Sequence, residues 1–86
     1  MNISVELTLT PLQDDFEPVI IDFIKQLRSS GLIVLENPLS TQVYGKYGTV
    51  MSLLQKEMKM ALNAMDKGLL YIKIVKSDRS DYEPHF

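Results

Sequence analysis

The spacing of apolar residues changes twice along this chain, from every second residue to every third or fourth, and this limits the fold more than any other feature. In residues 3–10, which show the first pattern, polar residues separate Ile3, Val5, Leu7 and Leu9. Such alternation predicts a half-buried β-strand. Pro11 is expected to end this strand, because proline has no N–H to donate to a neighbouring strand.

The next segment has the spacing of an amphipathic helix. Its apolar residues lie three or four positions apart along one face and are Phe16, Val19, Ile20, Phe23, Ile24 and Leu27. Asp14 and Asp15 are expected as N-caps, because a carboxylate accepts hydrogen bonds from the free N–H groups and suits the positive end of the helix dipole. Gly31 is expected to close the helix in the left-handed conformation.

The second half of the chain repeats the order strand, helix, strand after an additional hairpin. Asn37-Pro38 is a turn signal between two short strands. A second amphipathic stripe follows, and Gly68 is expected to stop that helix. The predicted elements are strands at 32–35, 40–45 and 69–76 and a helix over 47–65.

The element order is therefore βαββαβ. Residues 1–76 are expected to form one domain, followed by a polar and loosely ordered C-terminal tail, 77–86. Right-handed crossovers in both strand–helix–strand halves leave room for one strand between each parallel pair. The prediction is an α+β, ferredoxin-like fold, in which two helices cover one face of a four-stranded antiparallel sheet.

Alternation also assigns each strand residue to one face of the sheet. The face toward the helices is expected to carry Val5, Leu7, Leu9, Val34, Val43, Ile72 and Ile74. The open face is expected to carry Glu6, Thr8, Gln42, Tyr44, Tyr71 and Lys73 at its centre, with Ile33, Leu35, Leu69 and Val75 toward its edges. Contiguous exposed apolar surface usually marks an interface. We therefore predict a homo-oligomer, a dimer or a tetramer, that assembles through sheet faces or edges.

Composition argues against several functions. A formal net charge of -2 does not suit a nucleic-acid partner, which needs a basic face. With no cysteine and a single histidine, His85, we expect no catalytic residues and no metal site. Asp14, Asp15 and Glu17 are interpreted as helix-dipole partners and not as metal ligands. No apolar run is long enough to span a membrane, and we expect a cytoplasmic protein that is not an enzyme.

Two other functions were weighed against specific segments. The segment from Tyr44 to Gly48 superficially resembles the aromatic-glycine strand of an RNA-recognition domain, but the first strand carries no aromatic residue on its open face, so the stacking platform is missing. An acylphosphatase-like hydrolase needs an anion-cradling loop with an arginine near the first strand, and residues 12–15 do not supply it. Neither function is predicted.

Several short motifs, in order, carry a family resemblance. The segment 6–12 has an acidic residue, an alternating strand and then Pro-Leu, and 38–45 has the hairpin pattern Pro-x-Gly/Ser-Thr-x-x-x-Gly. Tyr47 and the pair Val50-Met51 stand at the start of the second helix, and an Asp-Arg pair follows the last strand within 77–79. Together they resemble the small single-domain thiamine-binding protein family of ferredoxin-like fold (YkoF-like).

The resemblance implies a non-enzymatic binder of thiamine or its hydroxymethylpyrimidine part, without another cofactor, that assembles through its sheets. Glu6 would offset the charge of the thiazolium or accept a hydrogen bond from the amino group of the pyrimidine. Hydroxyl and amide side chains of the hairpin would bind the pyrimidine edge, and a tyrosine would stack on a ring. The ligand-binding residues expected on this basis are Glu6, Thr8, Ser40, Thr41, Gln42, Tyr44 and Tyr47.

The same sequence allows an alternative function for the chain and an alternative role for Glu6. The chain can instead be a regulatory or oligomerisation module of the same topology that binds another small metabolite, with the open face serving only as an interface. For Glu6 itself, the alternative is a solvated glutamate beside Lys73 that contributes little to stability or binding.

Overall fold

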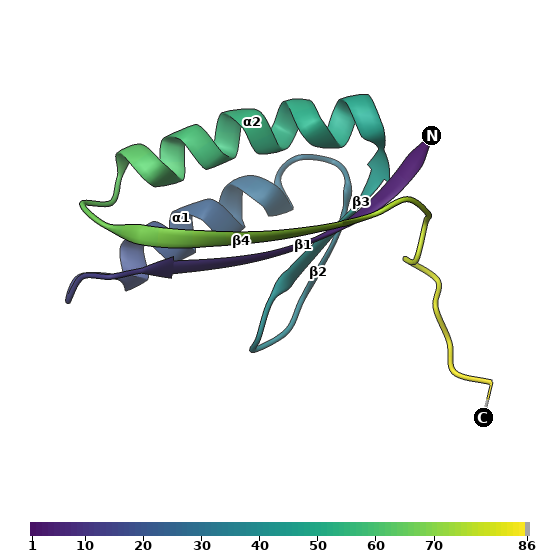
Figure 1. The fold of residues 1–86 in the computed structure, drawn as a ribbon, viewed down its shortest axis with the longest axis horizontal. Helices are drawn as coiled ribbons and strands as arrows, with labels where there is room; N and C mark the ends of the chain where they lie inside the picture. Colours follow the sequence, from purple (N-terminus) through teal and green to yellow (C-terminus); the bar gives the residue numbers. More distant parts are fainter. Residues whose placement is uncertain (86) are drawn as a thin grey trace.

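The computed structural model describes residues 1–85 and confirms the predicted element order (Figure 1). The strands are β1 (Asn2–Pro11), β2 (Ile33–Glu36), β3 (Thr41–Lys46) and β4 (Gly68–Val75), and the helices are α1 (Glu17–Arg28) and α2 (Tyr47–Asn63). None of the helices within residues 1–85 is both long enough and apolar enough to cross a membrane.

The four strands form one sheet in the order β2-β3-β1-β4, and every neighbouring pair is antiparallel. β3 therefore separates the parallel strands β1 and β2, and β1 separates β3 and β4, as the crossover argument requires. Both helices lie on the same side of the sheet (Figure 1). This is the predicted α+β, ferredoxin-like fold.

The core lies between the helices and the two central strands. Most residues of β1 and β3 that face the helices are almost fully buried, and some pair with one another across the sheet, as Val5 does with Val43. The buried core consists of Ile3, Val5, Leu7, Phe23, Leu27, Val43, Val50, Leu54 and Ala61. Burial of such aliphatic side chains is the main favourable term in folding, at about 1.5–3 kcal/mol each.

The prediction that Ile72 and Ile74 face the helices is confirmed, but neither residue is buried in the core. They pair with Leu7 and Val5 on the helix side of the sheet, yet they are 40% and 50% exposed. β4 is an edge strand, and the helices pack chiefly on β1 and β3. Alternation assigns a residue to a face of the sheet, but it cannot say how far the helices extend over that face.

The expected N-caps of the first helix are also wrong. α1 begins after Phe16, whose side chain makes no capping hydrogen bond, and neither Asp14 nor Asp15 occupies the cap position. Pro18 lies in the first turn, where its fixed φ suits the helix and its missing N–H costs nothing. Glu17 is the acidic residue of that turn and takes the expected place near the positive end of the helix dipole.

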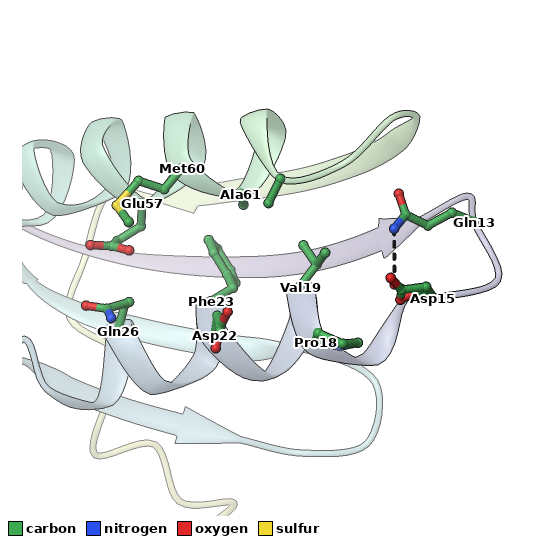
Figure 2. A pocket seen from close by; sticks show the side chains of 11 residues that line it. Gln13, Asp15, Pro18, Val19, Asp22, Phe23, Gln26, Glu57, Met60 and Ala61 are labelled. Carbon is green, nitrogen blue, oxygen red and sulfur yellow. Dashed lines mark hydrogen bonds between the residues drawn. The ribbon is translucent and has the colours of Figure 1, made fainter.

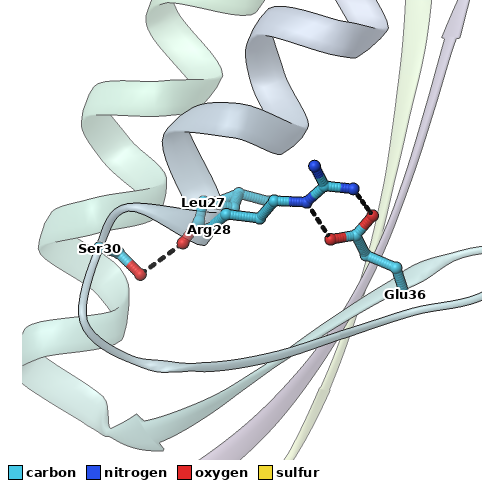
Figure 3. A network of polar contacts seen from close by, with 4 residues as sticks. All are labelled: Leu27, Arg28, Ser30 and Glu36. Atoms are coloured by element: carbon cyan, nitrogen blue, oxygen red, sulfur yellow. Dashed lines mark hydrogen bonds and ion pairs between the residues drawn. The ribbon is translucent and has the colours of Figure 1, made fainter.

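An ion pair joins the end of α1 to the end of β2 (Figure 3). Nε and Nη2 of Arg28 donate to the two carboxylate oxygens of Glu36 at 2.6 and 2.7 Å. The hydrogen bond from Arg28 lowers the pKa of Glu36. Its contribution to stability is therefore present above the ordinary carboxyl pKa and is lost as the pH falls through the lowered value. The Arg28 side chain is 60% exposed, so solvent screening keeps this contribution small.

Two glycines set the turns around these elements. Gly31 has a φ of 82°, the left-handed value expected where α1 ends. Gly68 pairs with Pro11 at the start of β4, and a Cβ atom there would overlap the Met65 side chain and lie 3.3 Å from the Pro11 Cα. The first position therefore needs glycine for its conformation, and the second needs it for space.

We expect Gly31→Ala to lower the free energy of unfolding by about 1–2 kcal/mol, because an L-residue is strained at positive φ. Gly48→Ala is the matched control. A Cβ atom would meet nothing within 4 Å at either position, but Gly48 lies inside α2 without a positive φ. The control should raise the stability by up to about 1 kcal/mol. Urea denaturation measures both, and equal effects of the two substitutions would contradict the expectation.

Candidate functional site

Glu6 stands at the centre of the open face. On β1 it lies opposite Gln42 of β3 on one side and opposite Lys73 of β4 on the other. No ion pair within 4.0 Å joins Glu6 to Lys73 in the described part of the chain; the carboxylate instead accepts a hydrogen bond from the Ser40 hydroxyl at 3.0 Å. Glu6 is exposed in this structure, and the hairpin gives its carboxylate one polar partner.

The hairpin between β2 and β3 places Ser40 beside Glu6. Asn37 Oδ1 accepts from the backbone N–H groups of Leu39 and Ser40 at 2.8 and 2.9 Å, and the Asn37 N–H donates to the Ser40 carbonyl. This side-chain bonding is what makes Asn-Pro a turn signal. Gln42 Nε2 then donates to the Ser40 hydroxyl at 3.2 Å. Three of the predicted residues, Glu6, Ser40 and Gln42, therefore form one hydrogen-bonded chain.

A hollow of about 220 Å³ lies next to this chain on the open face. Its polar and charged lining residues come from three strands and the segment after β4 and are Ser4, Glu6, Gln42, Tyr44, Lys73 and Arg79. Tyr44 is only 9% exposed, so its ring forms a wall that packing holds in place. Carboxylate, amide, hydroxyl, ammonium and guanidinium groups thus converge on one small space. We call it the open-face hollow.

Two lining residues, Ser4 and Arg79, were not among the predicted site residues. The Ser4 hydroxyl donates to the Ser77 carbonyl at 2.6 Å and accepts from the Arg79 N–H at 2.9 Å, and Arg79 Nε donates to the Ser77 hydroxyl at 2.8 Å. Ser4 lies two residues before Glu6, so alternation alone places it on the same face. Arg79 belongs to the Asp-Arg pair of the family resemblance, but nothing in the local sequence links it to Ser4.

The beginning of the C-terminal tail is therefore held against β1, where the sequence predicted loose order. Beyond the Ser4 contacts, the Asp78 carboxylate accepts hydrogen bonds from the backbone N–H and the hydroxyl of Ser80 at 2.9 and 2.6 Å. These bonds lower the pKa of Asp78. The last predicted tail residue, Phe86, lies outside the described residues.

Thr8 and Thr41 belong to a different hollow, of about 180 Å³, between α1 and the β2–β3 hairpin. Thr41 pairs with Leu7, which puts it on the helix side of the sheet, and it is 7% exposed. The Thr8 hydroxyl donates to the Leu39 carbonyl at 3.3 Å. Ser40 lines this space and also donates the hydrogen bond to Glu6 on the open face. The structure therefore does not bring Thr41 together with the open-face residues.

Tyr47 also lies apart from the other predicted residues. It is the first residue of α2, is 47% exposed, and uses its N–H to donate to the Met1 carbonyl at 2.9 Å. The chain leaves the sheet at this point, so the alternation that places Tyr44 no longer governs Tyr47. It lines neither the open-face hollow nor the space behind the hairpin.

Comparison with known proteins gives a fold. No protein-family model and no curated protein matches this chain. Among solved structures, a Streptococcus pneumoniae protein has a TM-score of 0.83 at 22% identity, covering 94% of this chain and 92% of its own. A Thermotoga maritima protein assigned provisionally to thiamine biosynthesis or salvage has a TM-score of 0.80 at 19% identity, covering 90% of this chain and 85% of its own.

A third neighbour is a domain of unknown function from Bacillus cereus, with a TM-score of 0.75 at 15% identity, covering 91% of this chain and 78% of its own. The chain shares the fold of these proteins. That fold is consistent with the thiamine-binding family that the motifs resemble. At these identities the likeness concerns the arrangement of the backbone, so ligand and residue roles have to be argued from the open face itself.

We expect Ser4→Ala to release residues 77–82 from β1, because the substitution leaves the Ser77 carbonyl and the Arg79 N–H without their partner. The loss should be about 1–2 kcal/mol in unfolding free energy. Hydrogen–deuterium exchange should rise in this segment. Ser52→Ala, at an exposed position of α2, is the control and should change neither quantity. Unchanged exchange in Ser4→Ala would show that the two hydrogen bonds of the Ser4 hydroxyl do not hold the tail against β1.

Proposed function

We propose that the chain binds thiamine or its hydroxymethylpyrimidine part in the open-face hollow. The observation that carries this proposal is the chain of hydrogen bonds through Glu6, Ser40 and Gln42 beside that hollow. An aminopyrimidine presents a donor amino group next to acceptor ring nitrogens. A carboxylate next to an amide and a hydroxyl offers the complementary acceptors and donors.

The charges of the hollow favour the pyrimidine over the thiazolium as the part that is recognised. Glu6 contributes one negative charge, whereas Lys73 and Arg79 contribute two positive charges. The cationic ring of thiamine would therefore meet no net attraction, and Glu6 is better used as an acceptor for the amino group. Tyr44 is buried beside the hollow, so it would contact the ligand through the small part of its side chain that remains exposed.

Two further points support a binding role without chemistry of its own. The Thermotoga maritima neighbour carries a provisional thiamine-related assignment, and the motifs of the hairpin resemble the thiamine-binding family. The Ser40 hydroxyl is within hydrogen-bond reach of the Glu6 carboxylate, but no hydrogen bond from a third residue of 1–85 orients that carboxylate as a catalytic base would require. That the protein is cytoplasmic, needs no metal and is not an enzyme stays a prediction.

Isothermal titration with hydroxymethylpyrimidine and with thiamine tests the proposal. We expect both to bind, the pyrimidine at least as tightly as thiamine, because recognition rests on the pyrimidine edge. Glu6→Gln should weaken binding about tenfold or more, since it removes a charge-assisted hydrogen bond of about 1.5–3 kcal/mol. Glu17→Gln makes the same chemical change on α1, away from the hollow, and should bind like the original protein. No heat at millimolar ligand would overturn the proposal.

The second candidate is a regulatory or oligomerisation module, and the exposed margins of the sheet favour it. Ile33 and Leu35 on β2 are 53% and 45% exposed, and Leu69 and Tyr71 on β4 are 45% and 63% exposed. Both strands are sheet edges, and long apolar edges are templates for pairing with another chain. We propose that copies of the chain associate through these margins, with or without a ligand.

Light scattering after size-exclusion chromatography separates the two functions. The protein should elute as a dimer or tetramer, and Leu35→Glu should shift it toward the monomer, because a charge at an apolar interface is costly. If ligand binding is the function, Glu6→Ala abolishes binding and keeps the oligomer. If the face serves only as an interface, Glu6→Ala changes the oligomer itself. A stable monomer at every concentration would exclude the association.

A further inference from the structure

A second large hollow lies away from the open face, between α1 and α2 (Figure 2). It has a volume of about 500 Å³ and shares no lining residue with the open-face hollow. Its floor is apolar and consists of Val19, Phe23 and Ala61, each at most 8% exposed. We call it the interhelical cleft.

Glu57 is the unexpected member of this cleft. It lies on the buried side of α2, and its side chain is only 3% exposed. No hydrogen bond reaches its carboxylate from residues 1–85 apart from a distant ion pair, in which Lys56 Nζ is 4.0 Å from Oε1. Lys56 is the preceding residue of the helix and is 71% exposed, so its ammonium stands beside the cleft and not in it.

A buried carboxylate with so little compensation is costly unless a cation or a donor completes it. Figure 2 shows the Glu57 carboxylate between the two helices, across from Gln26 of α1. Gln26 lines the same cleft and contributes an amide. The cleft therefore has an acceptor at one end whose side chain is almost fully buried, whose oxygens keep only slight contact with solvent, and whose nearest charged group is 4.0 Å away.

The remaining charges of the cleft have the same sign. Asp15 and Asp22 also line it, and no lysine, arginine or histidine is among its described lining residues. Within α1 the lining residues run from Pro18 to Gln26, which at 1.5 Å per residue is about 12 Å along the helix, and Asp15 lies beyond Pro18, just before the helix begins. Carboxylates thus mark both ends of an apolar trough.

From this arrangement we infer that the interhelical cleft binds an aliphatic di- or polyamine. One ammonium group donates to the Glu57 carboxylate and to the Gln26 amide oxygen; the second donates to Asp22 when the amine is a short diamine, and to Asp15 when it is a longer polyamine. The methylene chain between them lies on Val19, Phe23 and Ala61. A metal ion does not fit this spacing, because no three carboxylate or histidine groups within residues 1–85 come close enough to share one.

The site is independent of the proposed pyrimidine binding, since it uses other residues on the other side of the sheet. A protein that binds the amine and ignores the pyrimidine would overturn only the open-face proposal. A protein that binds the pyrimidine and ignores the amine would overturn only this one.

Titration of the full chain with putrescine and spermidine, followed by amide chemical shifts, tests the inference. Shifts are expected in α1 around 22–26 and in α2 around 57–61, with none at Glu6 or Gln42. Glu57→Gln keeps the shape of the side chain and should weaken binding about tenfold or more. Glu17→Gln removes a carboxylate of α1 that does not line the cleft, and it should have no such effect.

Three results would overturn the inference. Equal losses of amine affinity in Glu57→Gln and Glu17→Gln would mean that the amine is attracted only by the overall negative charge of the protein. Equal chemical-shift changes with butanediol, which has the four methylene groups of putrescine without its ammonium groups, would mean that the ligand makes apolar contacts only. Displacement of the amine by equimolar Mg²⁺ would mean that the cleft is a site for inorganic cations. Should Glu57→Gln fail to give a folded amide spectrum, Asp22→Asn at the exposed rim provides the same comparison, with a smaller loss expected.

Discussion

The structure depends most on β1, a central strand that pairs with β3 on one side and with β4 on the other. Its helix-facing residues Ile3, Val5 and Leu7 are at most 2% exposed, and they set the register of β3 and β4 through their partners. Because side chains alternate, the same pairing delivers Ser4 and Glu6 to the opposite face. One strand therefore supplies both the centre of the hydrophobic core and the centre of the open-face hollow, and neither can be moved without the other.

The features that could be predicted are those that a short window of sequence controls. The spacings of apolar residues predicted the six elements and the topology. The alternation of side chains along a strand placed Glu6, Gln42 and Tyr44 on one face. The same alternation, counted from Gln42, would also have placed Thr41 on the helix side of the sheet, where it pairs with Leu7. The turn chemistry of Asn37 was equally local, because its side chain bonds to residues two and three positions ahead.

What could not be predicted depends on contacts between distant parts of the chain. Ser4 meets Arg79 across most of the sequence, and no periodicity links a serine in the first strand to a tail. Glu57 lies in the apolar stripe of α2, yet a helical stripe does not reveal that the space opposite is a cleft and not packed side chains. The exposure of Ile72 likewise depends on where the helices end above an edge strand.

The crowding around Gly68 has a bearing on the charge pattern of the open face. A side chain at this position would overlap Met65 and approach Pro11, so glycine lets the first residue of β4 pair closely with the end of β1. Were the strand to slide by one position, each of its side chains would turn to the other side of the sheet. Lys73 would then point toward the helices and an isoleucine would stand beside Glu6. The pairing register of β4, to which Gly68 contributes at its first residue, thus decides whether the carboxylate has an ammonium or a hydrocarbon for its neighbour.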